Sequence, residues 1–229
     1  MRKPTAALLL AGMCVVAACG TGTSQDIATS TSTTPPPTPV AMGALKELLL
    51  TPDQLTVAVG ATKLAVKTER TYMWDNETTV SEQDCRAVQE PAAASAYTGS
   101  QWIAVQGNVI EETSAARTHL VDQAVVAFVS AKDAAAFFTT ATQRWQACSD
   151  GHYTVTLAGR PAAAWTVGPV VDTDGTLSAT LTSEAKGHGC QRALTVINNV
   201  AIDVDVCSAD PGDAAMNIAH QIAAKVPAK

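Results

Sequence analysis

A cysteine-bounded hairpin near the C-terminal end constrains the fold of this chain more than any other segment. Asn198-Asn199 lies between two β-branched runs, and asparagine tolerates the left-handed backbone that two-residue hairpin turns require. Ile197 then opposes Val200, and counting outward from this pair places Cys190 opposite Cys207. The two cysteines fall at a non-hydrogen-bonded position, where the Cα atoms of antiparallel strands approach most closely. The spacing therefore predicts a cross-strand disulfide.

The same register assigns the two faces of the hairpin. Arg192 stands opposite Asp205, which predicts a cross-strand ion pair. Asp203 shares that face, and we interpret the two acids as structural partners of the arginine rather than as a catalytic carboxylate pair. The other face is predicted to be core, and its residues are Ala193, Thr195, Ile197, Val200, Ile202, Val204 and Val206.

The chain has six cysteines, two of them in its N-terminal region. Because the hairpin uses two more, Cys85 and Cys148 pair by elimination. A metal site is the alternative, but there is no close Cys-x-x-Cys pair, and an oxidising compartment favours disulfides. His188 lies beside Cys190 in sequence, and we interpret it as a solvated loop histidine. The sequence thus predicts two disulfides, no metal and no cofactor.

The N-terminal residues have the pattern of a bacterial lipoprotein signal peptide at 1–18. A basic start is followed by an apolar stretch that is shorter than the roughly 20 residues a membrane-spanning helix needs. Ala18 precedes Cys19, which we predict to be the lipidated residue, whereas the rival Cys14 follows the larger Met13. A plain secreted protein is the alternative. The pattern predicts a protein anchored by lipid to the outer face of the cell membrane.

Residues 19–42 differ in composition from the rest of the chain. They are rich in Ser, Thr and Pro and nearly free of charge and large apolar groups, so they cannot bury enough surface to fold. We interpret this segment as a tether and residues 43–229 as one domain. Losing the two basic residues of the signal takes the formal charge from −6 to −8. An acidic domain of this kind is unsuited to nucleic acid.

Periodicity and turn signals predict an α+β fold, an antiparallel sheet with helices packed on one of its faces. Helices are expected at 43–50, 52–59, 91–97, 130–147 and after Asp210-Pro211, which should cap the last one. Strands are expected at 63–68, 71–74, 102–111, 120–129, 153–157, 163–167, 176–185 and in the hairpin. The order strand, strand, helix occurs at 101–147 and again at 190–225, which suggests a pseudo-repeat.

Motifs for chemistry are scarce. There is no Gly-x-Ser-x-Gly elbow, no Gly-rich phosphate loop and no histidine pair with metal-ligand spacing. The segment 172–175 matches only the opening of a calcium loop. Aromatic side chains are the remaining clue, because some of them could line an apolar cleft. The candidates for ligand binding are Trp102, Tyr153 and Trp165, against the alternative that such residues are core.

Several short stretches together resemble the PknH-like extracellular domain family of actinobacteria, whose members include outer sensor domains of receptor kinases and free-standing lipoproteins. The stretches are Tyr97-Thr-Gly-Ser-Gln-Trp102, Asp122-Gln-Ala-Val-Val126, Trp145-Gln-Ala-Cys148, Cys190-Gln-Arg-Ala-Leu194 and Asn198-Asn-Val200. The resemblance implies two intradomain disulfides and a cleft for an extracellular ligand. The chain shows no kinase domain, so the resemblance implies ligand capture and not signalling.

These observations predict a non-catalytic lipoprotein of the cell envelope that binds or senses an extracellular ligand. The expected partners are the membrane, through the lipid anchor, and a small-molecule, envelope-lipid or glycan ligand. A structural or protein-interaction lipoprotein with an envelope protein partner is the alternative, and a cell-envelope hydrolase is the third hypothesis.

Overall fold

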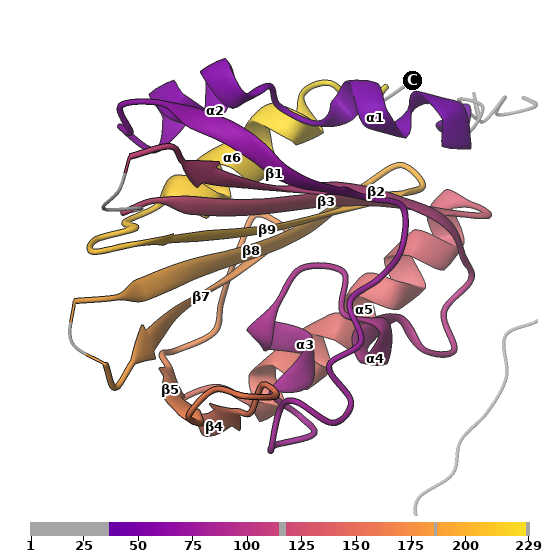
Figure 1. Cartoon of the computed structure of the whole chain (residues 1–229). Helices are drawn as coiled ribbons and strands as arrows, with labels where there is room; N and C mark the ends of the chain where they lie inside the picture. The colour runs from indigo at the N-terminus through magenta and orange to yellow at the C-terminus, as the bar shows by residue number, and fades with distance from the viewer. Residues whose placement is uncertain (1–36, 115–117, 186, 228–229) are drawn as a thin grey trace, which may run out of the picture. The chain divides into compact units, whose positions relative to one another are not determined.

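The computed structural model describes residues 37–114, 118–185 and 187–227. Within these ranges an antiparallel nine-stranded sheet carries helices on both of its faces (Figure 1). The helices are η1 (Met42–Ala44), α1 (Leu45–Leu48), α2 (Pro52–Ala58), α3 (Arg86–Gln89), α4 (Ala94–Tyr97), α5 (Ala131–Ala147) and α6 (Ala214–Ala223). The strands are β1 (Leu64–Arg70), β2 (Trp102–Glu112), β3 (Leu120–Phe128), β4 (His152–Val155), β5 (Ala163–Val167), β6 (Val171–Thr173), β7 (Thr176–Ser183), β8 (Gly189–Ile197) and β9 (Val200–Ser208).

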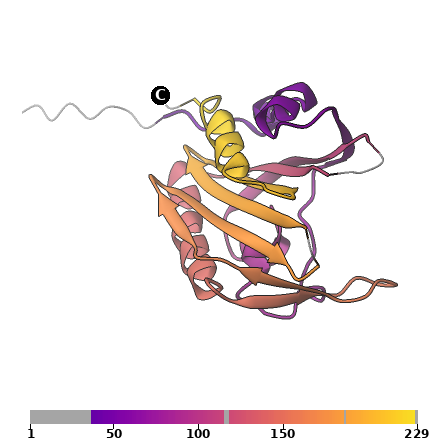
Figure 2. The same ribbon diagram turned by 90° about the vertical axis from the view of Figure 1, so that its left-hand side faces the viewer.

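The strand order is β1-β2-β3-β9-β8-β7-β5-β4, with β6 paired to β7. The predicted α+β class is therefore confirmed. The two strand–strand–helix segments form neighbouring hairpins, because β3 pairs with β9 at the centre of the sheet. Their helices lie on opposite sides of the sheet, α6 on one and α5 on the other (Figures 1 and 2).

One face of the sheet packs against α1, α2 and α6 in an aliphatic core. The buried residues of α6 are Ala215, Ile218, Ala219 and Ile222, and they meet the predicted core face of the hairpin. Thr51 and Gln54 form a capping box that begins α2 next to this core.

The opposite face packs against α3, α4 and α5 in a second core. Phe137 and Trp145 of α5 are buried there beside Tyr97 and Phe128. The disulfide Cys85–Cys148 joins the residue before α3 to the residue after α5, with a Cα–Cα distance of 5.0 Å. The expectation of helices on a single face was wrong. The central strands carry small apolar residues on both faces, so each face needs a cover.

The hairpin register is confirmed. Cys190 pairs with Cys207 and Ile197 with Val200, and the disulfide has a Cα–Cα distance of 4.0 Å. Asn199 does more than turn the chain. Its side chain binds the backbone N–H and C=O of Val40 and the C=O of Phe128, which attaches the start of the domain to the sheet.

Some local predictions were wrong. One continuous strand, β1, replaces the two expected near 63–74, and the acidic turn at Asp174-Gly175 joins the unpredicted β6 to β7. Asp210-Pro211 does not cap α6. The helix begins after Asp213, and Gln191 of β8 accepts a hydrogen bond from the backbone N–H of Ala215 at 2.8 Å. The cap therefore comes from a strand distant in sequence.

Candidate ligand-binding cleft

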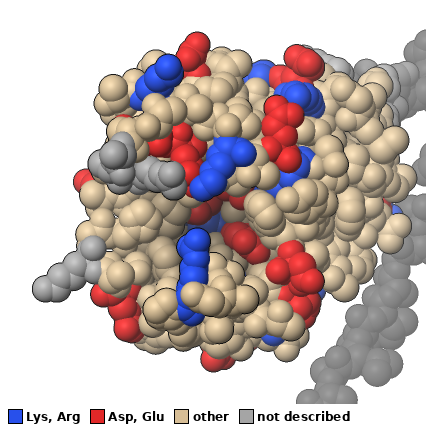
Figure 3. Space-filling view, in the orientation of Figure 1, with Lys and Arg blue, Asp and Glu red and all other residues tan. Residues whose placement is uncertain are grey.

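A cleft of about 380 Å³ opens on the sheet face that carries the cysteines. Its floor includes ends of β3, β8 and β9, and its walls come from β4, β5 and the segment that follows α3. Figure 3 shows this side of the molecule hollowed near its centre, with acidic and basic side chains around the hollow. The lining residues are Trp74, Gln89, Glu90, Pro91, Val109, Leu120, Asp122, Tyr153, Val155, Leu157, Ala163, Trp165, Leu181, His188, Cys190, Asp205 and Cys207.

Aromatic rings form part of the wall. Tyr153 of β4 faces Trp165 of β5 in the pairing of these strands, and their rings lie parallel with centroids 6.5 Å apart. Trp74 adds a third ring, which packs under the guanidinium of Arg70 at 4.9 Å. Two of the sequence candidates, Tyr153 and Trp165, thus lie in one cleft.

The third candidate, Trp102, lies elsewhere. It begins β2, it is 39% exposed, and it does not line this cleft. Trp145 is buried in the core, with its ring against the guanidinium of Arg192.

Asp122 on β3 is a fully partnered acid in the floor. Arg70 donates to one of its oxygens at 2.6 Å, and the indole N–H of Trp74 donates to the other at 2.9 Å. Burial raises the pKa of Asp122, and the charge of Arg70 opposes that rise. The strand pairing explains the placement, since β3 lies next to β9 and brings Asp122 level with Asp205.

The prediction that Arg192 forms its ion pair with Asp205 was wrong, because the partner is Asp203. Arg192 does stand opposite Asp205, but its guanidinium reaches diagonally to Asp203 at 2.8 Å. Its remaining hydrogen bonds go to the carbonyls of Val88 and Val204, at 2.8 and 2.6 Å. Asp203 also accepts hydrogen bonds from the backbone N–H of Ala92 and the hydroxyl of Tyr97. This pair is therefore satisfied and belongs to the core.

Asp205 is left without such partners. Its side chain is nearly buried, and within the described ranges its Oδ1 has no hydrogen-bond partner. Its Oδ2 lies 3.1 Å from the disulfide sulfur of Cys207, which carries no proton to donate. Burial raises the pKa of Asp205 to about 7 despite the charge of Arg192. Burial, with the nearby charge of Asp122, also raises the pKa of the half-buried Glu90 to about 7.

Sequence reasoning missed Glu90 and Asp122, and it assigned Asp205 to the wrong role. No local signal marks Glu90, which reaches the cleft because α3 ends beside the sheet. Asp122 and Asp205 carried a signal that could have been read, since an acid inside an otherwise apolar central strand needs a partner. The register that would have paired them depends on β3 lying beside β9.

A metal centre is not supported at the cleft. His188, Cys190 and Cys207 place ligand-type atoms within 4.8 Å of one another, but both sulfurs are bonded in the disulfide. A histidine–carboxylate pair does occur in the structure, with His119 Nδ1 3.2 Å from Glu112. It lies at the turn end of β2 and β3 and does not line the cleft.

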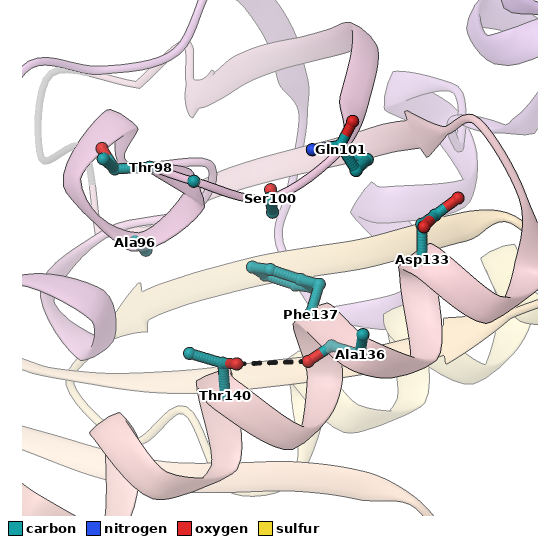
Figure 4. Close-up of a pocket in the computed structure, with 9 residues that line it drawn as sticks. Ala96, Thr98, Ser100, Gln101, Asp133, Ala136, Phe137 and Thr140 are labelled. Atoms are coloured by element: carbon teal, nitrogen blue, oxygen red, sulfur yellow. Dashed lines mark hydrogen bonds between the residues drawn. The ribbon is translucent and has the colours of Figure 1, made fainter.

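A second hollow, of about 200 Å³, lies between α5 and the loop after α4 (Figure 4). The ring of Phe137 projects from α5 toward Ser100 and Gln101, while the hydroxyl of Thr140 donates to the carbonyl of Ala136. Across the described residues, no buried polar atom that lacks a partner lines this hollow. The larger cleft therefore has the stronger chemical character.

Similarity to known proteins agrees with this geometry. The profile of the PknH-like extracellular domain matches residues 40–225. This chain belongs to that family. The PknH-like domain here is 33% identical to the chain described as the extracellular domain of PknH from Mycobacterium tuberculosis, in a crystal structure. The TM-score is 0.78, and the match covers 82% of this chain and 97% of that one.

The relatives with this PknH-like domain are larger proteins. Over 192 residues the chain is 35% identical to the serine/threonine-protein kinase PknH of Mycobacterium bovis and of Mycobacterium tuberculosis. The match covers 83% of this chain but only 31% and 30% of those kinases. None of the helices in the described ranges is both long and apolar enough to cross a bilayer. The predicted signal peptide and Cys19 lie outside the described residues.

Proposed function

We propose that this protein is a lipoprotein of the outer face of the cell membrane whose domain binds or senses an extracellular ligand without catalysing a reaction. The observation that carries the proposal is the cleft itself, with ring-lined walls and a nearly buried carboxylate, Asp205, that has an open oxygen. Ligand sites typically combine a mostly apolar lining with a few convergent polar groups. A buried polar group without a partner is costly, which favours a ligand as its partner.

Membership of an extracellular sensor-type family supports the location and the role. The kinase activity of the larger relatives belongs to parts of them that this chain does not match, so we propose ligand capture alone. The two disulfides support an oxidising compartment outside the cytoplasm.

The test of ligand capture is native mass spectrometry on the full chain secreted by an actinobacterial host. We expect a bound species of defined mass, lost on organic extraction. Ala163→Trp should abolish it by filling the cleft, because Ala163 is an exposed residue of the cleft wall. Ala164→Trp is the matched control, since the neighbouring residue of β5 lies outside the lining. If the unsubstituted protein and both variants each showed only their own apo mass, the proposal would be contradicted.

The anchor has its own test. Cys19→Ser should lose labelling by a fatty-acid probe and release the protein from membranes, because the acylated cysteine is the proposed site. Cys14→Ser should leave both properties unchanged. Persistent labelling of the Cys19→Ser protein would contradict the proposed anchor.

A protein-interaction role without a small ligand is the second candidate. Trp102, Ile103 and Val129 are 39, 45 and 58% exposed and lie at one end of the β2–β3 pair. Exposed apolar groups that cluster mark interaction surfaces more often than isolated ones do. A photoreactive residue at position 103 that cross-links one envelope protein, while one at exposed position 171 does not, would support this role.

A further inference from the structure

We propose that the cleft selects a cationic ligand, an ammonium group attached to an apolar, ring-sized body. This inference rests on the proposed function and adds the chemistry of the ligand. It is argued from the charges of the lining, the partners of each charge and the aromatic wall.

The lining is one-sided in charge. Among the described residues, it contains three carboxyl groups, from Glu90, Asp122 and Asp205, and neither lysine nor arginine. Within the described part of the lining, the imidazole of His188 is the one titratable nitrogen group. An anionic ligand would enter against these carboxylates, whereas a cation would be attracted by them.

The two arginines behind the floor do not cancel this preference. Arg192 directs its hydrogen bonds to Asp203 and two backbone carbonyls, as described above. Arg70 binds Asp122 and approaches the carbonyl of Pro91 at 3.5 Å. Both side chains are fully buried, so neither can turn toward a ligand. They satisfy Asp122 and Asp203 and leave Asp205 open.

Asp205 is the residue that a ligand would complete. It is only 8% exposed, it lines the cleft, and its Oδ1 lacks a partner among the described residues. An ammonium group donates hydrogen bonds and supplies the opposite charge, and both gains are larger in a site with little water. A neutral donor would supply only the hydrogen bond.

The aromatic wall suits the same ligand. Trp165 is half-buried beside Tyr153, and its ring is available to the cleft. The ring of Trp74 is already in contact with the guanidinium of Arg70. A cation near a tryptophan or tyrosine face is attracted by the negative face of the aromatic ring. The volume of about 380 Å³ lies at the lower end of the range for small-molecule sites, which indicates a compact body.

Binding should also depend on pH. The groups that face Asp205 and Glu90 are Arg70, Asp122, Tyr153, Arg192 and Asp203, with His188 on the rim. Because burial raises the pKa of both Asp205 and Glu90 to about 7, each is mainly neutral in weak acid. A cation should therefore bind more tightly as the pH rises through neutrality.

The experiment compares three probes of similar size by ligand-observed NMR titration. They are 2-phenylethylammonium, the neutral 2-phenylethanol and the anion 3-phenylpropionate. The protein is the full chain, processed by a secreting host and held in nanodiscs of uncharged lipid. We expect the ammonium to bind about tenfold more tightly than the alcohol, and the anion to bind most weakly. The preference should grow between about pH 5.5 and about pH 8.

The variants isolate the charge. Asp205→Asn should lower the ammonium affinity by about tenfold and change the alcohol affinity little. Glu90→Gln, at a half-buried position, is a second variant with the same expected direction should Asp205→Asn misfold. Asp174→Asn makes the same substitution on an exposed turn and should change neither affinity.

The outcomes are distinct. Equal binding of ammonium and alcohol, unchanged by both cleft variants, would overturn charge selection while leaving a ligand cleft in place. Tighter binding of the anion would overturn it as well. If no probe bound and native mass spectrometry also showed no ligand, the proposed function and this inference would fail together.

Discussion

The two faces of the β8–β9 hairpin are both buried, but they contain different chemistry. On the face covered by α6, residues such as Ile202 and Val204 pack with 0% exposure against other aliphatic groups. The opposite face carries Arg192, Asp203, Asp205 and the disulfide. The first face stabilises the fold by excluding water from hydrocarbon. The second uses buried charge, which contributes little net stability but positions specific groups at a cleft.

Within the charged face there is a further contrast between the two aspartates. Asp203 has three donors, and Asp205 has an oxygen with none in the described part of the chain. Both lie on β9 two residues apart, so their strand environment is nearly the same. Asp203 is therefore part of the core, whereas Asp205 lines the cleft.

The largest expected effect is the loss of stability when Asp203 is replaced. Asp203→Asn should destabilise the domain by about 3–5 kcal/mol, because Arg192 would keep a buried charge without its counter-ion. Denaturant unfolding at neutral pH measures this loss. If Asp205→Asn lowers the free energy of unfolding by as much, both aspartates are structural and the contrast between them is wrong.

A smaller effect on stability, of opposite sign, is expected for Asp205. Burial raises the folded pKa of Asp205 and of Glu90 to about 7, above the values of about 4 in an unfolded chain. The folded state therefore holds more protons between these values, and stability should fall as the pH rises from about 5 to about 8. Asp205→Asn should flatten this slope and stabilise the domain at about pH 8 by on the order of 2 kcal/mol.

Melting temperatures measured across that range, with Asp174→Asn as the matched control, test this prediction. In stronger acid the trend should reverse. Hydrogen bonds from Thr118 and His119 lower the pKa of Glu112 to about 2. Its contribution to the stability of the folded state is therefore present above about pH 4 and lost below it. A stability that rises steadily from about pH 5 to about pH 8 would contradict the assignment of Asp205.

The smallest expected effect is on the aliphatic face. Gln191→Ala should lower the free energy of unfolding by about 1 kcal/mol, because the backbone N–H groups that begin α6 would lose their acceptor. Urea unfolding and the helical circular dichroism signal report it. Gln146→Ala, which removes an exposed glutamine of α5 whose amide donates to the carbonyl of Val170, provides the control. A cost near that of Asp203→Asn would mean that the aliphatic face also depends on a buried polar contact.

Much of the fold could be predicted from local signals. The Asn198-Asn199 turn set the hairpin register, and Ser130 set the start of α5, because a turn or a cap is decided by a few neighbouring residues. The cover of both sheet faces was missed because it depends on β3 and β9 lying side by side at the centre of the sheet, with α6 over one face and α5 over the other.

By itself the sequence determined the two disulfides, the core face of the hairpin and the α+β class, and it named Tyr153 and Trp165 among three candidates for the cleft. The tertiary structure alone decided that Arg192 pairs with Asp203, that Gln191 caps α6, and that Glu90 and Asp122 join Asp205 around one cleft. Register and capping depend on residues close in sequence. The partner of a buried charge depends on which distant strands lie side by side, because charges separated along the chain interact only after the sheet has assembled.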